Sequence, residues 1–494
     1  MSIPTSPSHA AGGDQPSEGT PQPPFPPSAP QATPDATAGP NGSRLSRLRP
    51  HRPDAARVAR HRDLLTGSGV LVVGAGVQAL SGMLFSLIAA NGDAKSNFGN
   101  ASALFTSVLF VTYLAGLGLP VSLARYSADR SDDSHVVFSW GLVATVVSAI
   151  AATGLYLGAV DPKAADVLWS WSSIGGPVLF MVIVLGSAFS LVFDVRCMTM
   201  RRWNLVLVRI VIVGIAKVAL IPLSPDSHRR ALLLFVYLAA PVAVSGFVGV
   251  ALLPRITGGR HRLRPIPPSA RAAIRYSLVN YLSTLAYQAP YFALPVIVLI
   301  NVDAATNSSF YVAWGIVAIA FYVPSAIGQA LLAEGGKDGA QLRSQVRLAV
   351  LLAVALMGAG TVATFLGKSV VTAAYGHAYH DAARILPAMM LAGIPWAVTS
   401  LYLTEVRVMH RHSATVVITL TLTLAIIVPA LILVPGRGTN HGLNAASRSW
   451  LAGNIFAAIV ATIATWSGRK RAREREAVLD PVSPHSQAGE PITA

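Results

Sequence analysis

The sequence predicts an all-α membrane protein with about twelve transmembrane helices. Of its 494 residues, 53% are hydrophobic and 12% are charged, and its mean hydropathy is +0.53. A soluble domain carries roughly 25% charged residues. Apolar runs of about 20 residues, the length that a helix needs to cross the hydrocarbon core, recur along most of the chain. These features argue against a soluble enzyme, and a membrane barrel would show short alternating strands instead.

The chain begins with a segment rich in Pro, Ser and Ala, which has too little apolar mass to offset the entropy of ordering. We interpret residues 1–64 as a cytoplasmic tail, disordered at first and basic from Arg44 to Arg62. The basic run suits contact with anionic membrane lipid, or it serves only as a topology signal. No apolar stretch precedes about residue 65, so the first spanning helix is expected to direct insertion. The apolar segments lie at roughly 66–90, 102–124, 136–160, 174–195, 204–223, 231–253, 277–300, 309–333, 348–366, 384–406, 414–434 and 449–467.

Lysine and arginine are distributed unevenly between the two ends of these segments. With the N-terminus in the cytoplasm, about 28 of the 38 Lys and Arg residues lie on the cytoplasmic side, as the positive-inside rule requires. An error in one helix would invert every later loop, so the sustained bias supports twelve helices with both termini in the cytoplasm. Topology therefore accounts for the formal net charge of +16, and we expect no nucleic-acid partner.

The segments form two halves of six helices each. A basic cytoplasmic linker, 254–276, separates a bundle at 65–253 from a bundle at 277–467, and a basic and then disordered cytoplasmic tail occupies 468–494. The second and eighth segments share a small-residue cluster near the inner end and a charged exit. Six helices per half, an even number, would give two repeats of the same orientation. General hydropathy would also produce such weak similarity.

Few charged residues lie within the apolar segments, where a charge is costly unless it faces water or a partner. The fifth segment carries Arg209 and Lys217, eight residues apart and therefore on one broad face of a helix. Lys217 lies close to mid-membrane, and we expect it to face a cavity or to pair with an acid. Arg209 lies near the cytoplasmic end, where both snorkelling to the interface and a functional role are open.

Two acids lie at the cytoplasmic ends of spanning segments. Asp194 ends the fourth segment and Glu405 ends the tenth, and each precedes an arginine by two residues. Either acid is a candidate for ion or proton coupling, or a structural member of an interfacial pair. Asp194 has a further option, a salt bridge to Arg209 on the next helix.

The seventh segment is unusually polar in its inner half and is interrupted by two prolines, a combination that marks binding sites in transporters. Tyr287 and Tyr291 are one turn apart, so one face offers both rings to a sugar. Asn280 and Gln288 supply amide donors and acceptors. Interhelical hydrogen bonding with an interfacial tyrosine is the alternative interpretation.

The loops contain no convincing catalytic or cofactor site. His377 and His380 have a spacing that suits a metal, but only Asp381 accompanies them, which favours a surface role. The sequence has no phosphate-cradling glycine loop and no nucleotide-binding domain. Its single cysteine, Cys197, excludes an internal disulfide and a multi-cysteine metal site. We therefore expect no catalytic residue, metal or cofactor, and a polyprenyl-dependent membrane transferase is the least favoured function.

The chain resembles the polysaccharide-biosynthesis or oligosaccharide flippases of the multidrug, oligosaccharidyl-lipid and polysaccharide (MOP) exporter superfamily. The similar segments are FGNASALFTSVLFVTYLAGLGLPVSLARY, FYVAWGIVAIAFYVPSAIGQALLAEG, YGHAYHDAARILPAMMLAGIPWAVTSLYLTEVRV and HGLNAASRSWLAGN. The likeness covers most of residues 65–467 and rests on hydropathic patterns rather than on an invariant motif. It implies two six-helix bundles around a central cavity that opens alternately to each side, a MATE-like architecture.

The resemblance also implies a substrate, a location and partners. The substrate would be a polyprenyl-phosphate- or pyrophosphate-linked oligosaccharide, moved from the cytoplasmic to the outer leaflet of a bacterial plasma (inner) membrane for surface polysaccharide or cell-wall glycan synthesis. A glycan polymerase or glycosyltransferase machinery would be its protein partner. Lys217 and Arg209 would contact the phosphate, and the polar face of the seventh helix would contact the glycan.

An ion-coupled multidrug or small-metabolite exporter of the same superfamily is the alternative. Exporters of cationic drugs are expected to hold membrane acids, often in the first helix, yet residues 66–90 contain no Asp or Glu. The related lipid II flippases have additional helices and a cluster of cavity arginines, and this chain departs from them on both counts.

Overall fold

The structure is a computed structural model, and every element that it describes is a helix. Twelve helical segments among the described residues are long and apolar enough to cross a membrane, so the prediction of an all-α protein with twelve spans is confirmed. The disorder predicted near the two ends falls on residues 1–54 and 480–494, outside the described residues. The structure describes residues 55–116, 132–159, 162–223, 229–257, 264–265, 268–334, 339–409, 411–436 and 438–479.

The spans of the N-terminal half are α1 (Ala55–Gly92), α2 (Lys95–Ala115), α4 (Asp132–Ala159), α6 (Gly175–Thr199), α7 (Trp203–Leu220) and α8 (Arg230–Thr257). Those of the C-terminal half are α9 (Pro268–Asn301), α10 (Ala304–Glu334), α11 (Gly339–Leu366), the pair α13 (His380–Leu391) and α14 (Gly393–Val408), α15 (His412–Leu433) and α16 (Thr439–Leu479). The shorter elements are α5 (Pro162–Trp171), α12 (Lys368–Tyr375) and the 3-10 helices η2 (Ile221–Leu223) and η3 (His377–Tyr379).

The two halves repeat one packing pattern. α2 packs against α4, α6 and α8, and α10 packs in the same way against α11, the α13–α14 pair and α16. The contact of α6 with α8 is matched by that of α14 with α16. The short helices α5 and α12 each follow the third span of their half. This correspondence supports the internal repeat suggested by the sequence.

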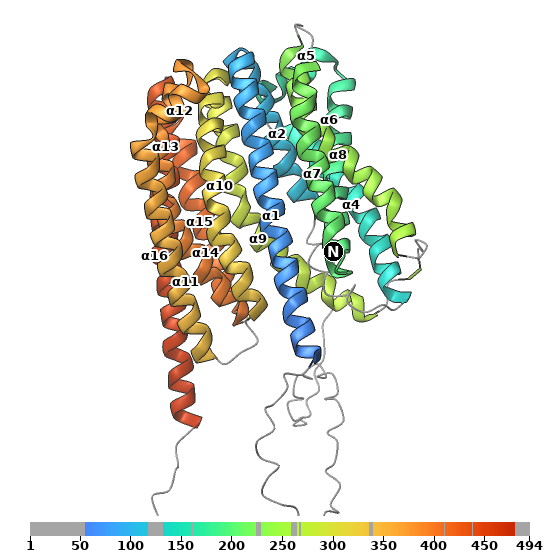
Figure 1. Cartoon of the computed structure of the whole chain (residues 1–494), viewed down its shortest axis with the longest axis vertical. Helices are drawn as coiled ribbons and strands as arrows, with labels where there is room; N and C mark the ends of the chain where they lie inside the picture. The colour runs from blue at the N-terminus through green and yellow to red at the C-terminus, as the bar shows by residue number, and fades with distance from the viewer. Residues whose placement is uncertain are drawn as a thin grey trace, which may run out of the picture. The chain divides into compact units, whose positions relative to one another are not determined.

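α2 connects the two halves, because it packs against α9 and α10 as well as against α8. Figure 1 shows α1 between α10 and α7. The backbone of α2 at Gly99 approaches the Ala304 carbonyl of α10 so closely that a Cβ would not fit. The fully buried Asn307 donates a hydrogen bond to the Gly99 carbonyl oxygen at 2.8 Å. This packing buries Phe98 and Gly99 in the first turns of α2, and the helix begins at Lys95, before the predicted 102.

The predicted tenth span, 384–406, is two helices with a break at Ala392. Pro395 has no N–H to donate to the carbonyl of Leu391 four residues earlier, so the helical hydrogen-bond ladder is interrupted there. Hydropathy does not detect the break, because both pieces are apolar.

Several helices extend beyond the predicted boundaries, and the longest extensions reach into the predicted tails and linker. α1 begins at Ala55, inside the predicted tail, and α9 begins at Pro268, inside the predicted linker. α16 continues to Leu479, well past the predicted end at 467. The Arg, Lys, Glu and Ala residues after 467 are strong helix formers, and Lys470 pairs with Glu474 one turn on, at 3.9 Å.

Gly246 of α8 permits the close approach of α6 and α8, since a Cβ there would overlap the carbonyl oxygen of Gly186 in α6. We expect Gly246→Ala to force the helices apart and to lower the free energy of unfolding by about 1–3 kcal/mol, measured as a lower Tm of the purified protein. Gly154→Ala in α4 is the matched control, because a Cβ there would meet no described atom within 4 Å apart from its own stretch of helix. Equal destabilisation by the two changes would contradict this account.

Candidate functional site

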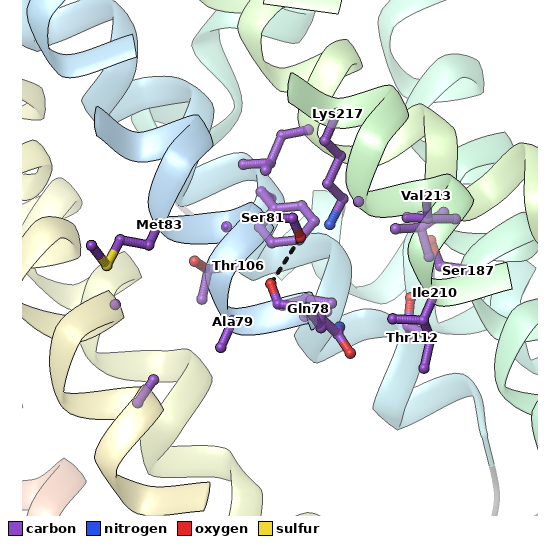
Figure 2. A pocket seen from close by; sticks show the side chains of 18 of the residues that line it. Gln78, Ala79, Ser81, Met83, Thr106, Thr112, Ser187, Ile210, Val213 and Lys217 are labelled. Carbon is purple, nitrogen blue, oxygen red and sulfur yellow. Dashed lines mark hydrogen bonds between the residues drawn. The ribbon is translucent and has the colours of Figure 1, made fainter. Parts of the chain in front are cut away.

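A cavity of about 340 Å³ lies between helices of both halves. Its wall on the N-terminal half comes from α1, α2, α6, α7 and α8 and is rich in hydroxyl groups, whereas its wall on the C-terminal half comes from α9 and α10 and is mainly aromatic. Figure 2 shows part of the hydroxyl-rich wall. The serine and threonine side chains that line the cavity are Ser81, Ser86, Thr106, Thr112, Ser187 and Ser190.

Lys217 projects from α7 into this cavity, and only 4% of its surface is exposed. Its Nζ lies 5.2 Å from the centroid of the Phe105 ring on α2, and its amine points toward Ser81 of α1 (Figure 2). α1 approaches α7 here because Gly214 has no side chain, so that a Cβ at 214 would lie 3.1 Å from the Cβ of Ser81. No carboxylate among the described residues forms an ion pair with Lys217.

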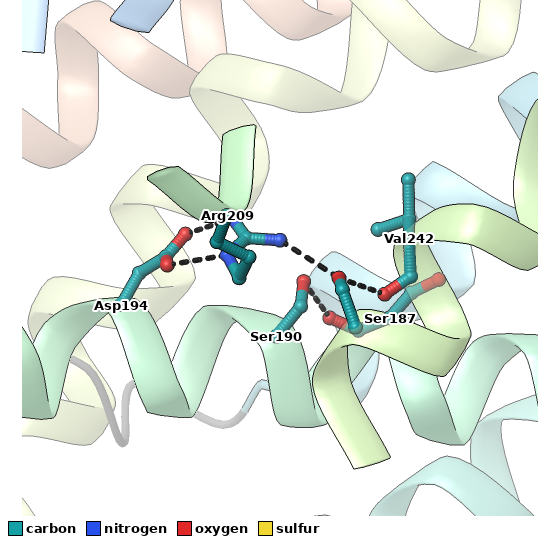
Figure 3. Close-up of polar contacts among 6 residues, drawn as sticks. Ser187, Ser190, Asp194, Arg209 and Val242 are labelled. Atoms are coloured by element: carbon teal, nitrogen blue, oxygen red, sulfur yellow. Dashed lines mark hydrogen bonds and ion pairs between the residues drawn. The ribbon is translucent and has the colours of Figure 1, made fainter. Parts of the chain in front are cut away.

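Arg209 lies on the same wall and is paired with Asp194 of α6 (Figure 3). Its Nε donates to Asp194 Oδ1 at 2.8 Å, and its Nη2 forms an ion pair with Oδ2. Its Nη1 donates to Ser245 Oγ of α8 at 3.2 Å. Asp194 therefore pairs with the arginine of the next helix rather than with Arg196, two residues on in the sequence.

The charge balance of the cavity follows from these contacts. Asp194, Arg209 and Lys217 are the Asp, Glu, Lys and Arg side chains among the described residues that line it. Asp194 compensates Arg209, so Lys217 carries one uncompensated positive charge. Charges interact strongly where water is scarce, and this wall therefore favours an anion and disfavours a cation.

A second cavity, of about 260 Å³, adjoins the first on the side of the C-terminal half. The two share Gln78 of α1 and Tyr291 of α9, and the second is also lined by Tyr287 and Gln288. Three of the four residues predicted on the seventh span therefore line a cavity. Asn280 lies on α9, but its side chain is outside the described residues.

Aromatic rings from four helices, α9, α10, α14 and α16, form one wall of the second cavity. Phe321 of α10 stacks on Trp396 of α14, with ring centroids 4.7 Å apart and planes 11° apart. Trp450 of α16 stacks on Phe321 at 5.9 Å, and Tyr287 lies 6.2 Å from Trp396. The buried Nε1 of Trp450 has no hydrogen-bond partner among the described residues. This wall of the cavity is therefore apolar and aromatic.

Glu405 is placed differently from Asp194, although their surroundings in sequence are alike. DVRCM ends α6 and EVRVM ends α14, so the two acids occupy equivalent positions in the repeat. Glu405 is fully buried and accepts hydrogen bonds from Arg469 of α16, from Nε at 2.8 Å and from Nη2 at 2.6 Å. Neither partner is among the described residues that line the two cavities. The geometry makes the Glu405 pair a contact between α14 and α16.

Sequence reasoning missed the hydroxyl-rich wall and the aromatic wall. Phe321, Trp396 and Trp450 lie in apolar spans, where a packed core aromatic is the ordinary expectation, and no local signal distinguishes a ring that lines a cavity. For metals, no group of three or more His, Cys, Asp or Glu side chains is placed to hold an ion in the part of the chain that the structure describes.

No family model and no curated protein matches the sequence. Solved structures do match its fold. An inward-facing multidrug resistance MATE family transporter of the MOP superfamily has a TM-score of 0.58 and 17% identity, over 81% of this chain and 95% of that chain. An outward-facing structure of such a transporter has a TM-score of 0.58 and 16% identity, over 84% and 96%.

A third structure is a MOP superfamily transporter from Pyrococcus furiosus, described as having a binding pocket of reverse polarity that suggests a different function. It has a TM-score of 0.57 and 16% identity, over 84% of this chain and 96% of that chain. At these identities the comparisons show the fold: the chain has the architecture of the MATE transporters of the MOP superfamily.

Proposed function

We propose that this chain, with its MATE fold and twelve spans, is a flippase for a polyprenyl-phosphate- or pyrophosphate-linked oligosaccharide. The observation that carries the proposal is the uncompensated charge of Lys217 in the cavity wall. A phosphate oxygen would form a charge-assisted hydrogen bond with this amine. The hydroxyls of Ser81 and Thr106 lie on the same wall and now donate to the backbone carbonyl oxygens of Gln78 and Ser102, so each would have to turn from that carbonyl to donate to the phosphate. The charge of Arg209 is largely neutralised by its ion pair with Asp194. Arg209 would therefore contribute less than Lys217 to phosphate binding.

The aromatic cavity supports the glycan part of the proposal. Tyr287 and Trp396 line this cavity with aromatic surface against which the apolar face of a sugar can pack, while Gln288 provides an amide for hydroxyl groups. Phe321 stacks on both Trp396 and Trp450 and so supports this wall from within. Taken together, the adjoining cavities of about 340 and 260 Å³ are of the size that holds a drug-sized ligand. In this conformation they would receive the phosphates and the first sugar, with the polyprenyl chain left in the lipid.

On this proposal the substrate crosses from the cytoplasmic to the outer leaflet of a bacterial plasma membrane by alternating access, for cell-surface polysaccharide or cell-wall glycan synthesis. The two solved neighbours captured facing inward and outward show that related proteins of this fold adopt both states. A glycan polymerase or glycosyltransferase machinery would use or supply the lipid-linked glycan.

An ion-coupled exporter of drugs or small metabolites is the second candidate, because the solved structures of similar fold include multidrug resistance transporters. For a cationic drug the charge balance is unfavourable, since Asp194 is already paired and Lys217 repels cations. The aromatic wall alone would suit either kind of ligand.

Mass spectrometry of lipid-linked glycans tests the proposal in cells that lack the gene. We expect one polyprenyl-linked oligosaccharide to accumulate and its surface polymer to disappear, and we expect the wild-type gene to reverse both effects. An unchanged lipid-glycan pool together with increased drug sensitivity would instead support the second candidate.

A further inference from the structure

A third cavity lies at the corner formed by α12, η3 and α13, and it shares no lining residue with the two cavities above. Its volume is about 490 Å³. The polar side chains that line it are cations, histidines and hydroxyl groups, and no acid is among its described lining residues. They are Lys368, Ser369, Thr372, His377, His380 and Arg384.

Arg384 is held in place by two neighbours. Its Nη2 donates to Asn440 Oδ1 of α16 at 2.9 Å and lies 3.3 Å from Asp381 Oδ1. Its Nε is buried and has no hydrogen-bond partner among the described residues. Asp381 compensates part of the Arg384 charge, which leaves Lys368 as the main positive charge. The cavity therefore combines an oriented guanidinium donor with a free ammonium group, a pair of groups suited to phosphate oxygens.

Exposed apolar side chains flank the first lining residues of this cavity in the sequence. Phe365 and Leu366, at the end of α11, are 62% and 76% exposed, and Val370 of α12 is 67% exposed. Lys368 lies between them in the chain, with its Nζ 4.5 Å from the centroid of the Phe365 ring. A cationic cavity with exposed apolar side chains beside its lysine suits a phospholipid, whose acyl chains would contact the apolar side chains while its phosphate enters the cavity.

We infer that this cavity binds the phosphate group of an acidic membrane lipid. The inference is independent of the proposed substrate, because it uses neither Lys217 nor the aromatic cavity. The same segment meets the N-terminal half: Asn91 donates to the Ala374 carbonyl oxygen at 3.0 Å, and Lys95 Nζ lies 5.0 Å from the Tyr379 ring centroid. A lipid bound at α12 would thus stabilise the α12–η3 segment, through which the C-terminal half contacts the end of α1 and the start of α2.

Site-specific fluorescence quenching on the full chain tests the inference. Val370→Cys provides an exposed labelling position next in sequence to the lining residue Ser369. The label is specific to this position because Cys197, the single cysteine of the sequence, is buried. The labelled protein is placed in phosphatidylcholine nanodiscs that contain either nitroxide-labelled phosphatidylglycerol or nitroxide-labelled phosphatidylcholine. We expect half-maximal quenching at an about fivefold lower mole fraction of the phosphatidylglycerol.

Charge variants identify the groups responsible for the preference. We expect Lys368→Gln and Arg384→Gln each to remove the preference for phosphatidylglycerol, and Lys368→Arg to keep it. Lys163→Gln is the control, because it removes a lysine from α5, the helix that matches α12 in the other half, and it should leave the preference unchanged. Equal quenching by the two lipids without these substitutions, or a preference that survives both neutral substitutions, would overturn the inference. Displacement of the phosphatidylglycerol by millimolar inorganic phosphate would overturn the lipid assignment and identify a site for free phosphate.

Discussion

Lys217→Gln is expected to abolish most flipping of a lipid-linked glycan in proteoliposomes. The substitution removes the uncompensated cation of the cavity while keeping a side chain of similar length that can donate hydrogen bonds. A hydrogen bond to a charged group contributes about 1.5–3 kcal/mol, so the affinity for the phosphate should fall by about ten- to 150-fold. Lys217→Arg keeps the charge and is expected to retain part of the activity. The measurement is the initial rate of glycan transfer to the opposite leaflet.

Arg448→Gln is the control for an unspecific effect of charge. Arg448 lies on α16, is exposed and lines neither central cavity among the described residues, so its replacement should leave the rate unchanged. Full activity of the Lys217→Gln protein would remove Lys217 from the mechanism and with it the main support for an anionic substrate.

Glu405→Gln is expected to destabilise the fold strongly. Glu405 is fully buried, and its two hydrogen bonds join α14 to α16 through an Arg469 side chain that is 20% exposed. Breaking a buried ion pair by removing one charge costs about 3–5 kcal/mol, because the remaining charge loses its partner away from water. The expected result is a markedly lower Tm in detergent. Arg469→Gln, which leaves the buried carboxylate unpaired, should have an effect at least as large.

The Lys470–Glu474 pair on the same helix provides a matched comparison. Its side chains are 71% and 59% exposed and 3.9 Å apart, and an exposed pair of this kind contributes at most about 1 kcal/mol. Lys470→Gln should therefore leave the Tm nearly unchanged. A similar Tm loss for Lys470→Gln and Arg469→Gln would show that the burial of Glu405 is not the cause.

Differences between the predicted and observed helices follow from forces that hydropathy does not measure. The break at Ala392 depends on the missing N–H of Pro395. The start of α2 at Lys95 depends on the packing of Gly99 and Asn307 between two helices. The continuation of α16 to Leu479 depends on helix propensity outside the apolar run. In each case hydropathy locates the apolar segment, but backbone chemistry, helix packing or helix propensity decides where the helix begins or ends.

The charged residues of the candidate site could be predicted from the sequence more fully than its aromatic residues. Lys217 was found because a charge in an apolar span is rare and costly wherever the helix packs. The sequence does not decide which arginine pairs with Asp194, because the choice depends on how α6, α7 and α8 pack together. Trp396 and Trp450 gave no signal, since an aromatic ring in an apolar helix looks the same whether it faces the core or a cavity.

The sequence by itself determined the helical class, the number of spans and the position of the exceptional charge. These depend on the transfer cost of about 20 consecutive residues, which is a local property of the chain. Tertiary structure alone decided which groups meet. Asp194 is paired inside a cavity, whereas its repeat counterpart Glu405 is paired outside both central cavities. Such contacts join residues that are distant in sequence, and their energies depend on packing and burial that arise only when the helices assemble.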